Sequence, residues 1–281
     1  MLFRSQERPR FPYEYPAHLQ SQTEDLPRAA GVYYFHGEGQ SVPLYIGKSV
    51  NIRTRVLNHL RTPEEARMLM QTRTITHVRT AGDIGAQLLE AQQIKALQPL
   101  YNKKLRRLQR LCSIALDLAG VRFVYSNEPD FRVRESLYGL FGSKVRAVEA
   151  LRTLADEHGL CYARIGIERT VRGRPCFRHA TGRCAGVCCG KEDGLAHDLR
   201  LRGALASIEV AKWPYPGRVA IEERDDGGRQ LHVIDHWRYC GSAGSLREAR
   251  KLKIADCEFD RDDYYILAKP ILQSDFKLWE L

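Results

Sequence analysis

Hydrophobic positions near the N-terminus follow first a strand pattern and then a helix pattern. Two short runs, GVYYF at 31–35 and PLYIG at 43–47, flank a turn that contains Gly and Ser. After Ser49 the apolar side chains recur at helical spacing, at Ile52, Val56 and Leu60. We therefore predict a β-hairpin that leads into an amphipathic helix, with Ser49 as a suitable N-cap for that helix.

The next elements complete a small domain. A short helix is predicted over 63–71, because Pro63 suits a first helical position, and a strand over 75–82, where polar and apolar residues alternate. Residues 83–97 have helical periodicity, and Pro99 ends the regular pattern. The sequence therefore predicts a small three-stranded sheet backed by helices.

The rest of the chain alternates between strand and helix patterns. We predict a hairpin over 111–127, a helix over 143–158, a helix over 193–212, a hairpin around the turn 225–228, a helix over 245–254 and a final strand in YYILAKPIL, interrupted at a sheet edge by Pro270. The expected fold class is α+β, with helices layered on sheets. The expected divisions are a lead-in over 1–25, a first domain over 26–105 and a C-terminal domain over 106–281.

Charge narrows the choice of partner. The formal net charge of +10 at pH 7 and the pI of about 9.3 favour a polyanion. One group of basic side chains follows Asn102 and consists of Lys103, Lys104, Arg106, Arg107 and Arg110. A second group lies among the cysteines and consists of Arg169, Arg172, Arg174, Arg178 and Arg183. Both are candidates for phosphate binding, and an ordinary solvated helix face is the alternative for the first group.

No segment predicts insertion into a membrane. The N-terminus carries charges and prolines where a signal peptide would have an apolar core, and no stretch approaches about eighteen apolar residues. We expect a cytoplasmic protein that acts as a monomer and has no membrane partner. Eight cysteines in a reducing compartment favour metal or redox chemistry over disulfides.

Polar side chains line up beside the apolar stripe of the first predicted helix. Asn51, Arg55 and His59 recur at i, i+4 spacing, which places them on one face. The hairpin, its following turn and the helix can bring together Tyr33, Tyr45, Lys48, Arg55 and His59. Gly47-Lys48-Ser49 resembles the end of a phosphate-binding P-loop, but Val42 stands where that motif requires glycine. A nucleotide hydrolase is therefore disfavoured.

Glu90 lies on the apolar stripe of the helix predicted over 83–97. At about 100° per residue it shares that stripe with Ala86, Ile94 and Leu97. Burial of an unpaired carboxylate is costly, so a metal or another cation is expected against it. Pairing with an arginine, or a side chain that extends to solvent, is the alternative for an isolated glutamate.

Two tripeptides resemble the halves of the GIY-YIG nuclease signature. They are Gly31-Val32-Tyr33, with Val in place of Ile, and Tyr45-Ile46-Gly47. Arg55 follows Tyr45 by ten residues, and Glu90 and Asn102 are twelve residues apart, which matches the family's arginine, acidic metal ligand and asparagine. The resemblance implies that residues 26–105 are a GIY-YIG domain, a metal-dependent DNA endonuclease with one Mg²⁺ or Mn²⁺ on Glu90.

Hydrolysis of a phosphodiester needs an activated water, a neutralised phosphate and a stabilised leaving oxygen. We assign Tyr45 as the general base, with nearby Lys48 making its phenolate more accessible. Arg55 clamps the scissile phosphate through paired donors. The remaining positioning roles, for water, phosphate or their hydrogen bonds, go to Tyr33, His59 and Asn102.

Cysteines concentrate in the segment 161–190. Four of them have fourteen, seven and three residues between them in turn and form the expected ligand set, namely Cys161, Cys176, Cys184 and Cys188. Four soft ligands suit an iron-sulfur cluster or Zn²⁺. Cys189 is the alternative to Cys188 as the fourth ligand. Cysteines without ligand spacing, predicted as core thiols, are Cys112, Cys240 and Cys257.

The Cys-rich segment is similar to that of UvrC-type excision-repair nucleases, on its spacing and on Arg174-Pro175-Cys176 and Gly182-Arg183-Cys184. That resemblance implies a [4Fe-4S] cluster, whose negative charge Arg178, Arg183 or His179 would offset. It also implies incision on the 3′ side of a lesion in double-stranded DNA, after UvrA has loaded UvrB. Because the second nuclease domain of full-length UvrC is not visible here, we expect one cut.

Two other functions are compatible with the sequence. One is a self-targeting GIY-YIG nuclease of mobile elements or branched DNA, which finds its substrate without UvrB. The other is a catalytically idle DNA-binding module held by a structural cluster. The presence of the full set Tyr45, Lys48, Arg55 and Glu90 argues against the idle module.

Overall fold

The structure is a computed structural model, and the residues that it describes are 14–39, 41–103, 110–117, 120–128, 131, 136–171, 174–253, 259–273 and 275–281. Contacts within the chain define two units. The first contains residues 1–108, 215–255 and 262–281, and the second contains residues 109–214 and 256–261. The segment predicted as one C-terminal domain over 106–281 is therefore divided between the two units.

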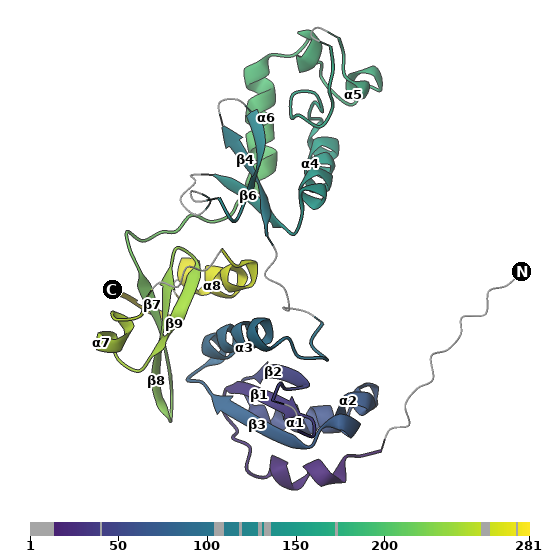
Figure 1. The fold of residues 1–281 in the computed structure, drawn as a ribbon. Coiled ribbons are helices and arrows are strands. Elements are labelled where there is room, and N and C mark those ends of the chain that lie inside the picture. The colour runs from purple at the N-terminus through teal and green to yellow at the C-terminus, as the bar shows by residue number, and fades with distance from the viewer. Residues whose placement is uncertain are drawn as a thin grey trace, which may run out of the picture. The chain divides into compact units, whose positions relative to one another are not determined.

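The predicted hairpin and the third strand form the first sheet (Figure 1). Its strands are β1 (Gly31–His36), β2 (Tyr45–Ser49) and β3 (Thr74–Arg79), in the order β2-β1-β3, with antiparallel pairing throughout. Strand β1 is central and β2 lies at an edge. The predicted α+β class and the small three-stranded sheet are confirmed.

Helices cover both faces of this sheet (Figure 1). Phe35 and the other buried side chains of one face pack with α1 (Ile52–Leu60) and α2 (Ala66–Gln71). On the opposite face Val32 packs against α3 (Asp83–Leu97). Short 3₁₀ helices lie at Ala17–Leu19, Ser21–Thr23 and Pro63–Glu65. Alternation along β1 thus directs successive side chains to two different helical layers.

The N-cap of α1 is Asn51, so the assignment of Ser49 was wrong. The Asn51 side chain accepts a hydrogen bond from the amide of Thr54 at 3.0 Å. The Ser49 hydroxyl instead accepts from the Asn51 amide at 2.9 Å and donates to the Asn51 carbonyl at 2.8 Å. Ser49 therefore stabilises the turn before the helix.

The C-terminal part of the first unit is a four-stranded antiparallel sheet. Its order is β10-β7-β8-β9, with strands at Val219–Asp225 (β7), Gly228–Asp235 (β8), Arg238–Ala243 (β9) and Lys277–Glu280 (β10). The predicted hairpin turn at 225–228 joins β7 to β8. Helix α7 is limited to Leu246–Ala249, which is shorter than the helix predicted over 245–254.

The final strand predicted around Pro270 is wrong, because residues Arg261–Gln273 form helix α8. Tyr264, Leu267 and Ile271 are buried, and their spacing is helical. The apolar side chains in this stretch are dense enough to fit both helix and strand periodicity. The buried side chains show that the helix is the correct assignment. Pro270 lies inside α8, near its end.

The second unit contains a sheet of order β5-β4-β6. Its elements are β4 (Cys112–Asp117), β5 (Gly120–Tyr125), β6 (Leu137–Phe141), α4 (Lys144–His158), α5 (Phe177–Ala180), a 3₁₀ helix at Val187–Cys189 and α6 (Gly194–Ala206). Helices α4 and α6 pack on the sheet through one apolar core. Ser143 caps α4, and Gly159 ends it in the left-handed conformation, as its sequence predicts.

Candidate active site and cysteine cluster

The edge strand β2 organises the candidate active site. Its outward-facing backbone groups bind side chains, since no strand lies on that side within the described sheet. Asn102 accepts a hydrogen bond from the Ile46 amide at 2.9 Å and donates to the Ile46 carbonyl at 2.8 Å. Glu90 accepts from the Lys48 amide at 3.1 Å. Asn102 and Glu90 thereby make the hydrogen bonds that a neighbouring strand would make to the residues before and after Gly47.

Gly47 lets two tyrosines approach each other across the hairpin. Tyr33 pairs with Gly47 in the sheet, and a Cβ atom at Gly47 would lie 2.3 Å from the Tyr33 hydroxyl and 2.9 Å from Cε1 of Tyr45. The ring centroids of Tyr33 and Tyr45 are 6.3 Å apart. The second glycine of the signature is thus a steric requirement of the site.

Tyr33 belongs to a buried hydrogen-bonded chain that ends on a glutamate. Its hydroxyl lies 2.6 Å from Nε2 of His59, which is 2% exposed, and Nδ1 of His59 bonds to Glu65. Burial strongly raises the pKa of Tyr33, and Tyr45 raises it further. Tyr33 therefore keeps its proton, and its hydroxyl, the His59 ring and the Glu65 carboxylate form one continuous hydrogen-bonded chain. Glu65 was missed, because only the fold brings it to His59.

Lys48 pairs with a carboxylate at the start of α3. Its Nζ forms an ion pair with Oδ1 of Asp83 at 2.7 Å. Burial raises the pKa of Tyr45, and Glu90 raises it further, while Tyr33 and Arg55 act in the opposite direction. The action of Lys48 on the Tyr45 phenolate stays a prediction. The lysine joins β2 to the first residue of α3, and Asp83 is a second residue that sequence analysis missed.

Glu90 has the properties expected of a cation ligand. The side chain is half-buried, and burial raises its pKa, against the influence of the Lys48 amide, the Lys48 charge and Arg55. Arg55 is exposed on α1 and its charge acts on Tyr33, Tyr45 and Glu90 alike. The structure therefore brings Tyr45, Arg55 and Glu90 to one site, where a divalent cation would offset the carboxylate.

Most of the first group of basic residues lies outside the residues that the structure describes. Lys103 is exposed immediately after Asn102. Lys104, Arg106 and Arg107 fall outside the described residues. Their role in DNA binding stays a prediction.

Four cysteine side chains meet in the second unit. The sulfur atoms of Cys161, Cys176, Cys184 and Cys188 lie within 4.8 Å of one another, and all but Cys188 are buried. Backbone amides of Cys176 and Gly186 donate to the sulfurs of Cys188 and Cys184, each at 3.3 Å. Donors of this kind stabilise thiolate charge, so the set fits an iron-sulfur cluster or Zn²⁺.

Cys189 turns away from the group. Its Sγ contacts the Gly186 carbonyl at 3.3 Å. Among the other cysteines, Cys112 is a buried core residue and Cys240 is half-buried, while Cys257 lies outside the described residues. The sulfurs that lie together are therefore those of the predicted ligand set with Cys188, and not with Cys189, as its fourth member.

The Arg178 side chain is engaged by backbone carbonyls and a carboxylate and makes no hydrogen bond to the four sulfurs among the described contacts. The side chain is 4% exposed, donates to the carbonyls of Leu160 at 3.1 Å and Ala155 at 2.9 Å, and forms an ion pair with Asp156. The carbonyls in and just after the last turn of α4, at the negative end of the helix dipole, attract this cation. His179 bonds to the Cys184 carbonyl at 2.8 Å, and therefore orients a ligand's backbone.

Of the second basic group, three members are exposed, namely Arg169, Arg174 and Arg183, whereas Arg172 lies outside the described residues. These exposed side chains keep the potential to bind phosphate. The buried Arg178 does not, because its donors are engaged.

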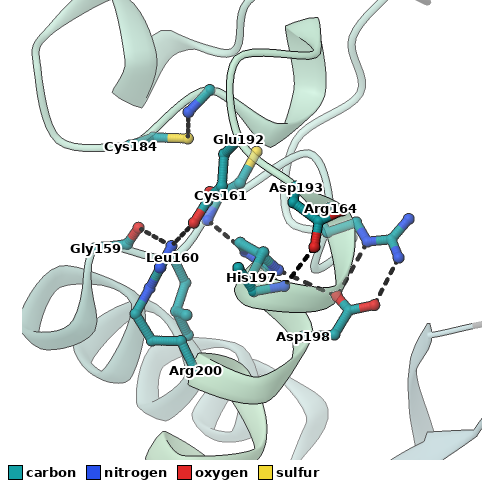
Figure 2. Close-up of polar contacts among 12 residues, drawn as sticks. Gly159, Leu160, Cys161, Arg164, Cys184, Glu192, Asp193, His197, Asp198 and Arg200 are labelled. Atoms are coloured by element: carbon teal, nitrogen blue, oxygen red, sulfur yellow. Dashed lines mark hydrogen bonds and ion pairs between the residues drawn. The ribbon is translucent and has the colours of Figure 1, made fainter.

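Helix α6 fixes the backbone of the first cysteine (Figure 2). The Cys161 amide donates to Nε2 of the buried His197 at 3.0 Å. Nδ1 of His197 lies 3.2 Å from Asp198, which pairs with Arg164 at 2.6 Å. His197 was missed by sequence analysis, since it lies 36 residues from its partner. It orients Cys161 without being a ligand itself.

Three family matches agree with this geometry. Residues 29–103 match the UvrC-like GIY-YIG domain, residues 103–207 the middle domain of the UvrC/Cho excinucleases, and residues 218–281 the C-terminal domain of excinuclease Cho. The fold and the site thus define a DNA-repair endonuclease of the GIY-YIG class.

Relatives with known names specify the family. The chain is 51% identical to excinuclease Cho of Escherichia coli K12 over 269 residues, which is 96% of this chain and 91% of that protein. It is 47% identical to excinuclease Cho of Salmonella typhimurium, over 96% of this chain and 92% of that protein. The chain belongs to the excinuclease Cho family, and the resemblance to UvrC-type excision-repair nucleases is confirmed.

More distant similarity extends to UvrC itself. The UvrABC system protein C of Thermus thermophilus is 31% identical over 194 residues, which is 66% of this chain and 31% of that protein. The GIY-YIG endonuclease domain of Thermotoga maritima UvrC, solved with its catalytic magnesium, is 28% identical with a TM-score of 0.28, over 31% of this chain and 97% of that domain. Within the described part of the chain, no helix combines the length and the apolar character needed to cross a membrane.

Proposed function

We propose that the protein hydrolyses one phosphodiester bond on the 3′ side of a DNA lesion, after UvrA has loaded UvrB on the damaged duplex. The observation that carries the proposal is the meeting of Tyr45, Arg55 and Glu90 beside the edge strand β2. The relatives named UvrABC system protein C support the repair context. Damaged double-stranded DNA is the substrate, and UvrB is the partner of a monomeric nuclease.

The chain's own residues divide the work of hydrolysis. Arg55 is exposed and points its charge at the tyrosines, so it clamps the scissile phosphate. Tyr45 accepts a proton from the attacking water. Because burial raises the Tyr45 pKa, the phenolate forms only when positive charge enters the site. Glu90 would hold one Mg²⁺ or Mn²⁺, and the ion would supply positive charge for the leaving oxygen.

The other predicted residues hold these groups in place. The Tyr33 hydroxyl is held by its hydrogen bond to His59 in a position to orient the water or the Tyr45 hydroxyl. Asn102 fixes the backbone of the residue next to Tyr45. Lys48 joins β2 to α3 and so sets the distance between Tyr45 and Glu90. DNA enters over Lys103 and the basic residues that follow it.

We infer that the four converging cysteines hold one inorganic centre. The iron-sulfur cluster predicted from the sequence is the first candidate. Zinc is the second, favoured by one observation, because the sulfurs are within 4.8 Å of one another and a tetrahedral zinc site with bonds of about 2.3 Å brings sulfurs to roughly 3.8 Å. Iron, sulfide and zinc analysis of protein purified without oxygen decides between the two.

A reconstituted incision assay tests the proposed function. A duplex with one lesion and labelled ends is incubated with the protein, with and without UvrA and UvrB. A single cut 3′ to the lesion that requires both partners is the expected result. Cutting without them supports a self-targeting nuclease, and the absence of cutting in either case supports an idle DNA-binding module.

A further inference from the structure

Helix α3 receives its N-terminal cap from the C-terminal sheet. Gly82 stands at the N-cap position and has no side chain with which to accept a hydrogen bond. Glu223 of β7, 139 residues from Ile84, accepts from the Ile84 amide at 2.9 Å and from the Gly85 amide at 2.8 Å. A carboxylate in this place satisfies free amides and faces the positive end of the helix dipole.

Glu223 is itself held firmly. The side chain is 7% exposed, and its Oε2 lies 2.9 Å from Nε2 of the fully buried His232. Nδ1 of His232 lies 2.7 Å from the Ser242 hydroxyl. Burial favours a raised pKa for Glu223, but His232 and the two helix amides outweigh it and lower the pKa. The cap is therefore a charged carboxylate at neutral pH.

Two glycines at the start of α3 make room for this contact. A Cβ atom at Gly82 would lie 2.2 Å from Oε1 of Glu223, and one at Gly85 would lie 2.6 Å from Cε1 of His232. Gly82 has an extended φ of −178°, which any residue can adopt. Glycine also weakens a helix relative to alanine. The fit to the C-terminal sheet therefore accounts for both glycines.

The capped turn belongs to the candidate active site. Asp83, the first residue of α3, binds Lys48 at 2.7 Å, and the Lys48 amide binds Glu90 about two turns further along the helix. A second contact lies near the other end of α3, where Lys95 pairs with Asp262 of α8 at 3.3 Å. The C-terminal domain thus contacts α3 on both sides of Glu90.

We propose that the C-terminal domain, residues 218–281, is a positioning element of the nuclease site: through Glu223 it fixes the first turn of α3, and with it the place of Glu90 beside β2. The inference rests on the proposed role of Glu90 as ligand of the divalent ion. Glu223 acts through α3 and touches neither substrate nor ion. Residues about 140 positions apart therefore build one site.

The ion requirement of the full-length protein tests this role. Glu223→Ala is expected to raise the Mg²⁺ concentration for half-maximal cleavage about tenfold, the effect of losing an N-cap. Saturating Mg²⁺ should restore most of the rate, because the catalytic groups are intact. A readout without cleavage is the Mg²⁺ concentration needed to raise the thermal unfolding temperature, with no DNA present, and it should shift in parallel. Glu223→Gln keeps an oxygen acceptor, so its Mg²⁺ requirement should lie between those of the wild type and Glu223→Ala.

Glu222→Gln is the matched control. Glu222 is a buried neighbour on β7 and bonds to Trp279 at 2.6 Å and to Arg224. Its loss should lower the unfolding temperature without a change in the Mg²⁺ requirement. If the Glu222 and Glu223 variants unfold earlier by similar amounts and both keep the wild-type Mg²⁺ requirement, Glu223 serves the fold alone and the proposal is overturned.

Gly82→Ala tests the same contact from the other side and replaces Glu223→Ala if that variant does not fold. The added Cβ should displace the Glu223 carboxylate and reproduce its loss. In a chain that already carries Glu223→Ala, the effect of Gly82→Ala on unfolding should nearly disappear. Additive effects would overturn the proposal. Cleavage that survives Glu90→Ala would instead refute the proposed function, and the unfolding data would still stand.

Discussion

The nuclease site and the cysteine cluster are held in place by different means. The nuclease side chains stand on strands and helices whose apolar faces are buried on both sides of a sheet. The cysteines lie around α5, a helix of four residues, and a 3₁₀ helix of three, and three of their own side chains are the core of the local buried cluster. The first site is therefore shaped by the fold, whereas the second depends on what its thiols bind.

Metal removal should separate the two regions most strongly. A structural zinc contributes about 10–16 kcal/mol to the folding of small zinc domains, so stripping the centre should unfold the segment 161–190. Hydrogen exchange of the stripped protein should show lost protection there and intact protection in the sheet of β1, β2 and β3. Cys189→Ser, as a control, should retain the metal, since Cys189 points away from the other sulfurs. Equal protection of both regions would contradict the claim that only the cysteine segment depends on its bound centre.

Loss of a charged group in the nuclease site should destroy activity but not the fold. Arg55→Ala and Glu90→Ala should each lower single-turnover cleavage by about 10²–10³-fold or more, because each removes a charge from the reacting phosphate or its ion. The Arg55 variant should keep the unfolding temperature and most of the DNA affinity of the wild type, since Arg55 is exposed. Arg53→Ala on the same helix serves as the control and should cleave normally. Retained cleavage in the Arg55 variant would remove that residue from the mechanism.

A change of one methyl group should disturb the nuclease site through its packing. Gly47→Ala places a Cβ atom 2.3 Å from the Tyr33 hydroxyl, so we expect a stability loss of about 1–3 kcal/mol and slower cleavage. Denaturant unfolding and cleavage of the same preparations measure both. At Gly217 a Cβ would meet no described atom within 4 Å, and Gly217→Ala should be neutral. A fully active, fully stable Gly47→Ala protein would show that the tyrosines are free to move.

The smallest effect is expected from weakening the hydrogen-bonded chain that runs from Glu65 through His59 to Tyr33. Glu65→Gln keeps the size of the side chain but weakens its bond to His59, so we expect a loss of about 0.5–1.5 kcal/mol in stability and a few-fold slower cleavage. The adjacent Glu64 is exposed, and Glu64→Gln should change neither quantity. If both variants behave alike, the chain from Glu65 to Tyr33 has no role in holding the site.

Local patterns predicted the elements that depend on local sequence. The span of α3 was predicted as 83–97 and is Asp83–Leu97, because its apolar stripe and the following Pro99 are both visible in the sequence. The span of α8 was predicted as a strand, because a dense apolar run leaves helix and strand undecided until the buried face is known. Periodicity therefore identified the amphipathic elements and failed where apolar residues were dense enough to fit both helix and strand spacing.

Side chains that act through distant partners could not be predicted. Asp83, Glu65 and His197 carry no spacing signal, since each becomes important only through a residue that the fold brings to it. Glu223 shows the same limit over a separation of 139 residues. Short motifs thus predicted the candidate reacting groups, whereas the groups that hold them required the structure.

The most direct test compares the wild-type protein with its Glu90→Ala variant over a Mg²⁺ titration. Both cut a duplex with one lesion and labelled ends, in the presence of UvrA and UvrB. The account predicts one Mg²⁺-dependent cut 3′ to the lesion by the wild type and none by the variant, with both proteins folded when Mg²⁺ is absent. A variant that makes the same cut with the same Mg²⁺ dependence would contradict it.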